Sequence, residues 1–268
     1  MQPTLVIDRR LLDANIDAII AQKSPSLSLR IVDKSLPCLP LLDHVLRKTG
    51  ASRIMSFHLP ITAQVLDRFS DVDILFGKPM PVASVQAMIR RLSKDACNRL
   101  FSRCVFLIDT ADRLAQYNAL ANDIRIPVRI AFEIDVGMHR GGFETPHALS
   151  SALASIRSNL LIACEGVMGY EAHIPSIPSL FGGSAREQAL VKKRFDAFVA
   201  VLEEDQKSIL NIGGSKTALT YQGEVLANEV SLGSACVMPS DFDCSALAML
   251  QSACAIATPI LKVLDTRL

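Results

Sequence analysis

The sequence lacks the features that mark most macromolecular partners. Lys and Arg number 28 and Asp and Glu number 27, so the net charge is only +1. Nucleic acids and anionic membranes attract proteins with a larger positive surplus. No apolar run approaches the roughly 20 residues that span a bilayer, and charged residues occur within the first ten positions, unlike a secretory signal. We therefore expect neither a nucleic-acid nor a membrane partner.

Paired cysteine and histidine motifs are also missing. The seven cysteines are odd in number and include no CxxC pair, so they indicate neither a disulfide framework nor a zinc knuckle. The histidines form no HxH or HExxH pair and have no cysteine at ligand spacing; they are His44, His58, His139, His147 and His173. We expect no metal ligands among these residues, and a reducing, cytoplasmic location.

The chain contains enough hydrophobic residues to form a large core. Of its 268 residues 50% are hydrophobic, and the mean hydropathy is +0.30. Two domains of about 150 residues would account for this length, and so would a single (β/α)8 barrel of about 250 residues.

Short β-rich runs alternate with helical segments along most of the chain, which predicts βαβ units and a parallel sheet. Eight runs in succession favour a closed (β/α)8 TIM-type barrel, and a doubly wound open sheet is the alternative. The expected strands are Leu27–Val32, Arg53–Phe57, Val72–Phe76, Cys104–Ile108, Val128–Ile134, Leu161–Gly169, Ser208–Ile212 and Asn228–Leu232.

Helices are expected between most of these strands and at both ends of the chain. The helical segments between strands include 60–69, 81–92, 111–120, 146–156 and 185–204. Before the first barrel strand, a short strand at Thr4–Ile7 precedes a helix that Asp8 caps. After the last, we expect a loop at 238–243, a helix at 245–252 and a strand at 253–264 interrupted by Pro259.

In a barrel of this kind the functional groups lie at the carboxyl ends of the strands. Lys34 follows the first barrel strand directly, and a lysine at the dry rim of a barrel loses hydration, which lowers its pKa and frees the amine for a Schiff base. A solvated loop lysine is the plain alternative. Lys78 also follows a strand, and position alone does not separate the two lysines.

Glycines and hydroxyls gather after the last two strands. In Asn211-Ile-Gly-Gly-Ser-Lys-Thr217 the glycines let backbone N–H groups approach an oxyanion, and Ser215 and Thr217 add hydroxyls. Gly233 and Ser234 follow the next strand, and these two loops often form the phosphate site of such barrels. The spacing is not that of a Walker A loop, and an ordinary tight turn is the alternative.

Arg140 and His173 each have both a functional and a structural interpretation. Arg140 could present a fixed cation to a ligand oxygen or ring nitrogen, or form a structural salt bridge. His173 could stack on a ring, relay a proton, or cap a loop.

Five colinear segments resemble the fold-type III pyridoxal-phosphate enzymes, specifically the alanine racemase N-terminal domain of the D-threonine aldolase and D-serine dehydratase-like group. They resemble that group's Arg-x-x-x-Lys, (D/E)-x-D-x-G-x-x-R-x-G, Gly-Tyr-x-x-His, Gly-Gly-Gly-Thr-x-Thr and Glu-x-x-x-Gly-Ser patterns. In that order the segments are 29–34, 133–143, 169–173, 211–217 and 228–234. The chain departs from the group in having Ile212 for a third glycine, Lys216 within the loop, and Ala235 and Cys236 where an aromatic residue is usual.

The resemblance implies pyridoxal 5'-phosphate as cofactor, with Lys34 forming the internal aldimine and moving a proton. Arg140 would contact the polar edge of the ring and His173 would lie against its face, as a second catalytic residue. The cofactor-binding residues implied are Lys34, Arg140, Tyr170, His173, Asn211, Gly213, Gly214, Ser215, Thr217, Gly233 and Ser234. The group also uses a divalent metal, for which no ligands are identifiable in this chain.

The same resemblance implies a lyase that cleaves a D-3-hydroxy amino acid by retro-aldol reaction or dehydrates D-serine. An amino-acid racemase, a single-barrel pyridoxal-phosphate-binding protein and an inactive truncated paralogue are the alternatives. We expect residues 1–250 to form the cofactor-binding barrel and 251–268 to resemble the first strand of a C-terminal β domain whose remainder the chain lacks. A homodimer is consistent with the resemblance.

Overall fold

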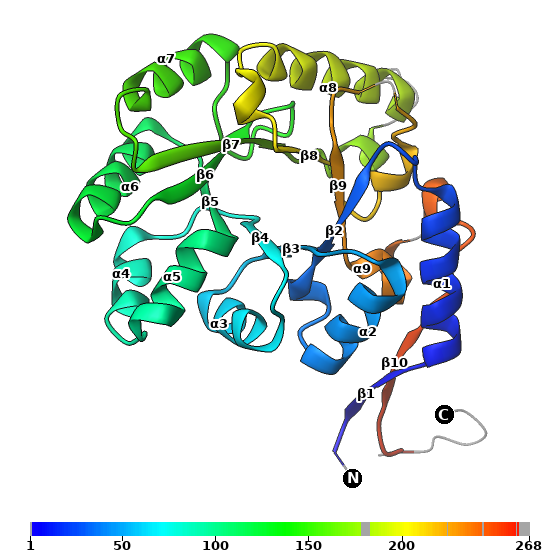
Figure 1. The fold of residues 1–268 in the computed structure, drawn as a ribbon. Coiled ribbons are helices and arrows are strands. Elements are labelled where there is room, and N and C mark those ends of the chain that lie inside the picture. The colour runs from blue at the N-terminus through cyan, green and yellow to red at the C-terminus, as the bar shows by residue number, and fades with distance from the viewer. Residues whose placement is uncertain (1, 178–182, 224, 243, 261, 263–268) are drawn as a thin grey trace.

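The computed structural model describes residues 2–177, 183–223, 225–242, 244–260 and 262, and eight parallel strands close into a barrel (Figure 1). Each strand lies within one residue of its predicted bounds. They are β2 (Ser28–Val32), β3 (Arg53–Ser56), β4 (Asp73–Phe76), β5 (Cys104–Ile108), β6 (Val128–Ile134), β7 (Ile162–Gly169), β8 (Ile209–Ile212) and β9 (Glu229–Leu232). β2 pairs with β9, from Ser28 opposite Glu229 to Ile31 opposite Leu232. This pairing confirms the TIM-type barrel and excludes the open sheet.

Helices cover the outside of the barrel between successive strands (Figure 1). They are α1 (Arg9–Gln22), α2 (Leu39–Thr49), α3 (Leu59–Arg68), α4 (Val82–Ile89), α5 (Lys94–Arg103), α6 (Ala111–Ile124), α7 (Pro146–Ile156), α8 (Gly183–Val199) and the short α9 (Ser234–Val237). Several begin at a side chain that accepts a free backbone N–H, as Asp8 does for Arg10 at 2.9 Å and Thr110 for Arg113 at 3.1 Å. None of the described helices is long and apolar enough to cross a membrane.

The sequence did not predict α5, which lies between α4 and β5. Its segment is mostly polar, but Cys97, Leu100 and Phe101 recur at helical spacing and are buried against the barrel. Ser93 caps it by accepting the N–H of Ala96 at 3.3 Å. These three buried residues form the face by which the helix packs against the barrel.

The predicted helix at 245–252 is wrong: the structure has only a 3-10 turn at Ser245–Leu247. The Asn15 side chain, from α1, donates to the carbonyl of Gln251 at 2.7 Å and accepts its N–H at 2.8 Å. These tertiary hydrogen bonds take the backbone groups that a helix would need.

The chain ends outside the barrel in a small antiparallel sheet. β1 (Thr4–Ile7) pairs with β10 (Cys254–Ala257), and the pair projects from the barrel below α1 (Figure 1). β10 realises part of the strand predicted at 253–264, of which residues 261, 263 and 264 lie outside the described residues. Both strands are largely exposed, including Leu5 and Ile256.

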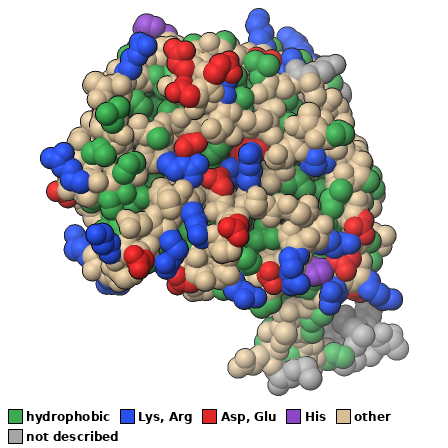
Figure 2. All heavy atoms as spheres, in the orientation of Figure 1, with side chains coloured by type: hydrophobic (Ala, Val, Ile, Leu, Met, Phe, Trp, Pro, Cys, Tyr) green, Lys and Arg blue, Asp and Glu red, His purple; other side chains and the backbone are tan. Residues whose placement is uncertain are grey.

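Apolar side chains fill two separate spaces. One large core lies between the strands and the helices, and a smaller cluster lies inside the barrel around Val32, Met55 and Met168. This separation follows from the period of two along each strand, because alternate residues face inward and outward. On the outer surface, positive and negative side chains are interspersed in the view of Figure 2.

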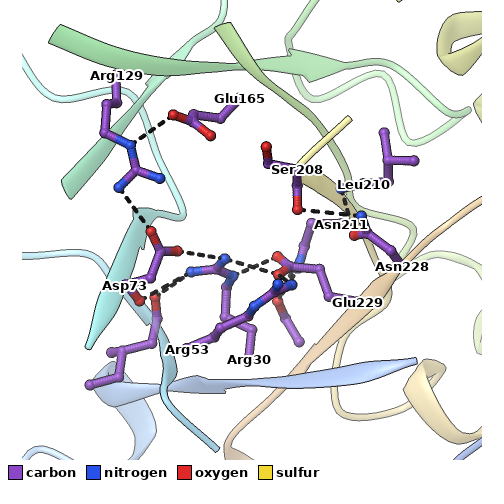
Figure 3. A network of polar contacts seen from close by, with 12 residues as sticks. Arg30, Arg53, Asp73, Arg129, Glu165, Ser208, Leu210, Asn211, Asn228 and Glu229 are labelled. Atoms are coloured by element: carbon purple, nitrogen blue, oxygen red, sulfur yellow. Dashed lines mark hydrogen bonds and ion pairs between the residues drawn. The ribbon is translucent and has the colours of Figure 1, made fainter. Parts of the chain in front are cut away.

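Charged side chains occupy the amino-terminal half of the barrel interior (Figure 3). Arg30 is fully buried, and its guanidinium donates to Glu229 at 2.5 and 2.9 Å and to Asp73 at 2.9 Å. Arg53 donates to Glu229 at 2.7 Å, and Arg129 donates to Asp73 at 2.9 Å. Because every charge has an opposite partner, the barrel tolerates ions in its interior.

The network reaches the carboxyl half of the barrel through Asn211. Its amide nitrogen donates to Glu229 and to the Ser231 hydroxyl, both at 2.8 Å. These hydrogen bonds fix the orientation of the amide. The interior network is therefore connected to the functional end of the barrel.

Candidate active site

A cavity of about 360 Å³ opens at the carboxyl ends of the strands. Ten of the eleven predicted site residues line it: Lys34, Arg140, Tyr170, Asn211, Gly213, Gly214, Ser215, Thr217, Gly233 and Ser234. Met55, Phe57 and Met168 contribute apolar wall. The structure thus brings together residues up to two hundred positions apart, as the predicted topology requires.

Lys34 lies in a 3-10 turn, Asp33–Ser35, directly after β2. Its ammonium lies 4.1 Å from the centroid of the Phe57 ring. Partial desolvation lowers the pKa of Lys34, and the nearby positive charge of Arg140 lowers it further. A lowered pKa leaves more of the amine unprotonated and able to react with a carbonyl.

The structure separates the two candidate lysines. Lys78 is exposed and is not among the residues that line the cavity, although its neighbour Gly77 is. Lys216 also lines the cavity, but its ammonium lies 4.7 Å from the Phe242 ring and donates to the carbonyl of Asp241 at 3.0 Å. Geometry therefore favours Lys34 as the reactive amine.

Arg140 forms the structural salt bridge that was one of its two alternatives, and it also lines the cavity, so its contact with a ligand stays a prediction. It forms an ion pair with Glu133 at 3.0 Å, and its guanidinium carbon lies 4.8 Å from the centroid of the Tyr170 ring. Phe143 closes the loop by donating its N–H to the carbonyl of Glu133 at 2.8 Å. Arg140 is thus a cation held at the cavity by a salt bridge.

The glycine loop after β8 is folded around its own hydrogen bonds. Thr217 accepts the Gly214 N–H at 3.0 Å, and Ser215 accepts the Gly233 N–H from the next loop at 3.2 Å. The N–H groups of Ser215 and Lys216 have no acceptor among the described residues. Two backbone donors in the cavity wall are therefore free for an anion.

Glycine is required at two positions because neighbouring groups approach closely. A Cβ at Gly214 would lie 2.7 Å from a ring carbon of Tyr170, and one at Gly233 would lie 2.6 Å from the carbonyl oxygen of Val32. Both contacts are closer than real Cβ atoms make. The loops after β8 and β9 thus pack against the site without side chains of their own at these points.

His173 is the predicted site residue that the structure does not place in the cavity wall. Its Nε2 lies 3.2 Å from a carboxylate oxygen of Glu187 on α8, and its buried Nδ1 has no hydrogen-bond partner in the described chain. Glu187 also lies 3.7 Å from Arg194. A role for His173 against a cofactor ring stays a prediction.

Sequence reasoning missed Phe57 and Glu171. Phe57 ends the predicted second strand of the barrel, and nothing in its neighbourhood shows that the ring meets Lys34. Glu171 lies inside the Gly-Tyr-x-x-His segment at a variable position, yet it is fully buried beneath the glycine loop. Among the described residues, no group of three or more His, Cys, Asp and Glu side chains is arranged to hold a metal ion.

Comparison with known proteins gives a consistent result. A family model described as "Alanine racemase, N-terminal domain" matches residues 7–241. An alanine racemase from Limosilactobacillus fermentum is 27% identical over 128 residues, which are 47% of this chain and 32% of that protein.

Solved structures match along nearly the whole chain. A D-threonine aldolase from Filomicrobium marinum has a TM-score of 0.77 at 15% identity, covering 96% of this chain and 69% of the other. An alanine racemase from E. faecalis has a TM-score of 0.73 at 19% identity, covering 95% and 65%. At these identities the likeness shows the fold alone. The chain spans about two thirds of the length of these structures and is matched to only a third of the curated relative.

Proposed function

Because the chain belongs to the alanine racemase N-terminal domain family, whose enzymes depend on pyridoxal phosphate, we propose that it is a pyridoxal-phosphate enzyme acting on a D-amino acid. The reaction proposed is cleavage of a D-3-hydroxy amino acid by retro-aldol reaction, or dehydration of D-serine. The observation that supports this most is the Lys34 amine, which has a lowered pKa and faces the same cavity as the glycine loop.

The residues of the cavity fit this cofactor. The free N–H groups of Ser215 and Lys216 suit a phosphate, and Gly214 leaves room where a side chain would meet Tyr170. The remaining cofactor-binding residues would be Asn211, Gly213, Thr217, Gly233 and Ser234. When bound, pyridoxal phosphate supplies an aldehyde that combines with amines and a ring that withdraws electrons from a substrate's Cα.

The chain's own groups would provide binding and proton transfer. Lys34 would hold the cofactor and would move a proton at the substrate's Cα through its Nζ. Arg140, held by Glu133, keeps a positive charge beside Tyr170 at the polar side of the cavity. Met55, Phe57 and Met168 limit water around the reacting amine.

Racemisation is the second candidate, and the alanine racemase match favours it. A racemase needs a second base opposite the lysine. Among the described residues that line the cavity, the only other side chains that ionise are Arg140, Tyr170 and Lys216. Burial raises the pKa of Tyr170, so its phenolate, the form able to act as a base, is disfavoured. We place the lyase first because segments 169–173 and 211–217 resemble those of the D-threonine aldolase and D-serine dehydratase-like group.

The test uses the purified chain loaded with pyridoxal phosphate. D-threonine, D-serine and D-alanine are supplied in parallel, and aldehyde, keto acid and L-alanine are measured. Aldehyde or keto acid that depends on Lys34 supports the lyase. L-alanine alone transfers the assignment to racemisation. A chain that binds the cofactor and turns over none of the three is a binding protein, as in the single-barrel alternative.

A further inference from the structure

A buried acid lies directly behind the glycine loop and has no part in the proposed chemistry. Glu171 follows β7 and is 0% exposed. We propose that Glu171 is a positioning residue of the phosphate site: its carboxyl holds the loop from Gly213 to Thr217, and it carries a proton when a phosphate group is bound, so that Thr217 donates to the phosphate. The inference rests on the proposed function, because the phosphate is that of the cofactor.

Both oxygens of the Glu171 carboxyl are used by the loop. Oε1 accepts the Thr217 hydroxyl at 2.5 Å, and Oε2 accepts the Gly213 N–H at 3.2 Å. The Thr217 oxygen in turn accepts the Gly214 N–H at 3.0 Å, and Ala218 donates to the Gly214 carbonyl at 2.8 Å. Glu171 is therefore the point to which the loop is attached, and it acts on the phosphate site through Thr217.

No positively charged side chain among the described residues is paired with the Glu171 carboxyl. The groups that face it are the Gly213 N–H and the Thr217 hydroxyl after β8, the neutral Tyr221 hydroxyl after the 3-10 turn Ala218–Thr220, and Tyr170 on its own loop. In the described part of the chain no Lys, Arg or His forms an ion pair with Glu171. Burial raises the pKa of Glu171 to about 7, although the hydrogen bonds from Thr217 and Gly213 oppose the rise. A proton on this acid is thus accessible at ordinary pH.

The hydroxyl of Thr217 has one proton and two lone pairs. While Glu171 is ionised, that proton points to Oε1, and Thr217 offers the cavity no donor. When Glu171 is protonated, its own proton goes to the Thr217 oxygen, and the Thr217 proton is released for another acceptor. Thr217 lines the cavity, and apart from the Gly214 carbonyl oxygen at 3.4 Å, the acceptor that we infer for the released proton is a bound phosphate. Protonation also removes a negative charge from behind the anion.

Two substitutions of Glu171 distinguish its role in holding the glycine loop from its role in carrying a proton. Glu171→Gln keeps an acceptor for Gly213 and a fixed donor for Thr217, so it imitates the protonated acid. Glu171→Ala removes both contacts with the loop. Glu165→Gln is the matched control, because Glu165 lies on β7, the strand that Glu171 follows, in the amino-terminal half of the barrel, and pairs with Arg129.

The measurement is the phosphate preference, defined as the affinity for pyridoxal phosphate divided by the affinity for pyridoxal, which lacks the phosphate. It is measured at pH 6.5 and at pH 8.5. Taking this ratio cancels effects of the ring and of Lys34. Relative to Glu171→Gln, the unmodified chain should lose about tenfold or more of its phosphate preference between the two pH values, since one proton is linked to binding. Ionisation of the phosphate itself affects both proteins equally. The Glu165→Gln control should behave as the unmodified chain does, and Glu171→Ala should lose the preference at both pH values.

Equal pH dependence in the unmodified chain and in Glu171→Gln would overturn the proposal, and so would an undiminished preference in Glu171→Ala. If neither pyridoxal phosphate nor pyridoxal binds, the proposed function fails and inorganic phosphate becomes the probe. In that case phosphate should raise the melting temperature of the unmodified chain less at pH 8.5 than at pH 6.5, compared with Glu171→Gln. The same shift in both proteins would contradict a role for Glu171.

Discussion

The hydroxyl of Thr217 donates a hydrogen bond of 2.5 Å to the carboxyl of Glu171, and both residues are buried, with 2% and 0% of their surface exposed. The bond couples a loop after β8 to the loop after β7 at the mouth of the barrel. Because the acid has no cationic partner among the described residues, its ionisation costs stability.

The first prediction concerns how the ionisation of Glu171 changes the free energy of unfolding with pH. The pKa of Glu171 is raised from 4.5 to about 7, so the folded chain binds a proton that the unfolded chain has released. Its contribution to stability is fully present below pH 4.5 and is lost as the pH rises to 7. Each unit corresponds to about 1.4 kcal/mol, so the loss is about 3 kcal/mol.

Glu171→Gln has no such loss. Urea unfolding at pH 4.5 and pH 8 should therefore show the variant gaining roughly 3 kcal/mol on the unmodified chain between the two values. The same difference at both pH values would mean that folding does not raise the pKa of Glu171.

The second prediction concerns the contact between Gly214 and Tyr170. In Gly214→Ala the new Cβ would lie 2.7 Å from the Tyr170 ring, so the ring must move from the cavity wall. Overpacking of this kind costs about 1–3 kcal/mol, and the affinity for pyridoxal phosphate, measured by absorbance titration, should fall about tenfold or more.

Gly50→Ala is the control for backbone strain alone. Gly50 has φ +67° and nothing within 4 Å of an added Cβ, so this variant should lose about 1 kcal/mol of stability and none of its affinity. Unchanged affinity in Gly214→Ala would show that the Tyr170 ring does not contribute to the site.

The third prediction concerns the charged interior drawn in Figure 3. Arg30→Met leaves the fully buried Glu229 with Arg53 as its one cationic partner among the described residues. Removing one member of a buried ion pair costs about 3–5 kcal/mol. Arg99→Ala, which breaks an exposed pair with Asp67, should cost less than about 1 kcal/mol. Similar losses of unfolding free energy in the two variants would contradict the importance of the network.

The barrel could be predicted because each strand is short, apolar and followed by a separate amphipathic segment. The parallel direction of the strands then places residues that follow them, such as Lys34 and Gly213, at one end of the barrel without knowledge of any contact. The failed helix at 245–252 has a different cause. The Asn15 side chain, more than 200 residues away in the sequence, forms hydrogen bonds with the backbone N–H and carbonyl of Gln251. The local sequence pattern at 245–252 contains no information about this partner.

The site could be predicted as a set of residues but not as a set of contacts. Lys34 and Lys78 are equivalent in sequence, and only the closed barrel shows that one faces the cavity and the other does not. Arg30 was visible only as part of a resemblance, because a buried arginine needs partners from β4 and β9 that no single segment reveals. Glu171 was not identified for the same reason, since its partners follow β8.

The fourth prediction concerns the central claim, that Lys34 is the amine that holds the cofactor. The chain is incubated with pyridoxal phosphate, reduced with borohydride to fix any covalent link, digested, and examined by mass spectrometry. We expect the label on the Lys34 peptide, and none on Lys78 or Lys216. In Lys34→Ala the visible absorption band of the cofactor should disappear, and in Lys78→Ala it should remain. A label on Lys78 or Lys216, or no label on Lys34 in a folded chain, would contradict the account.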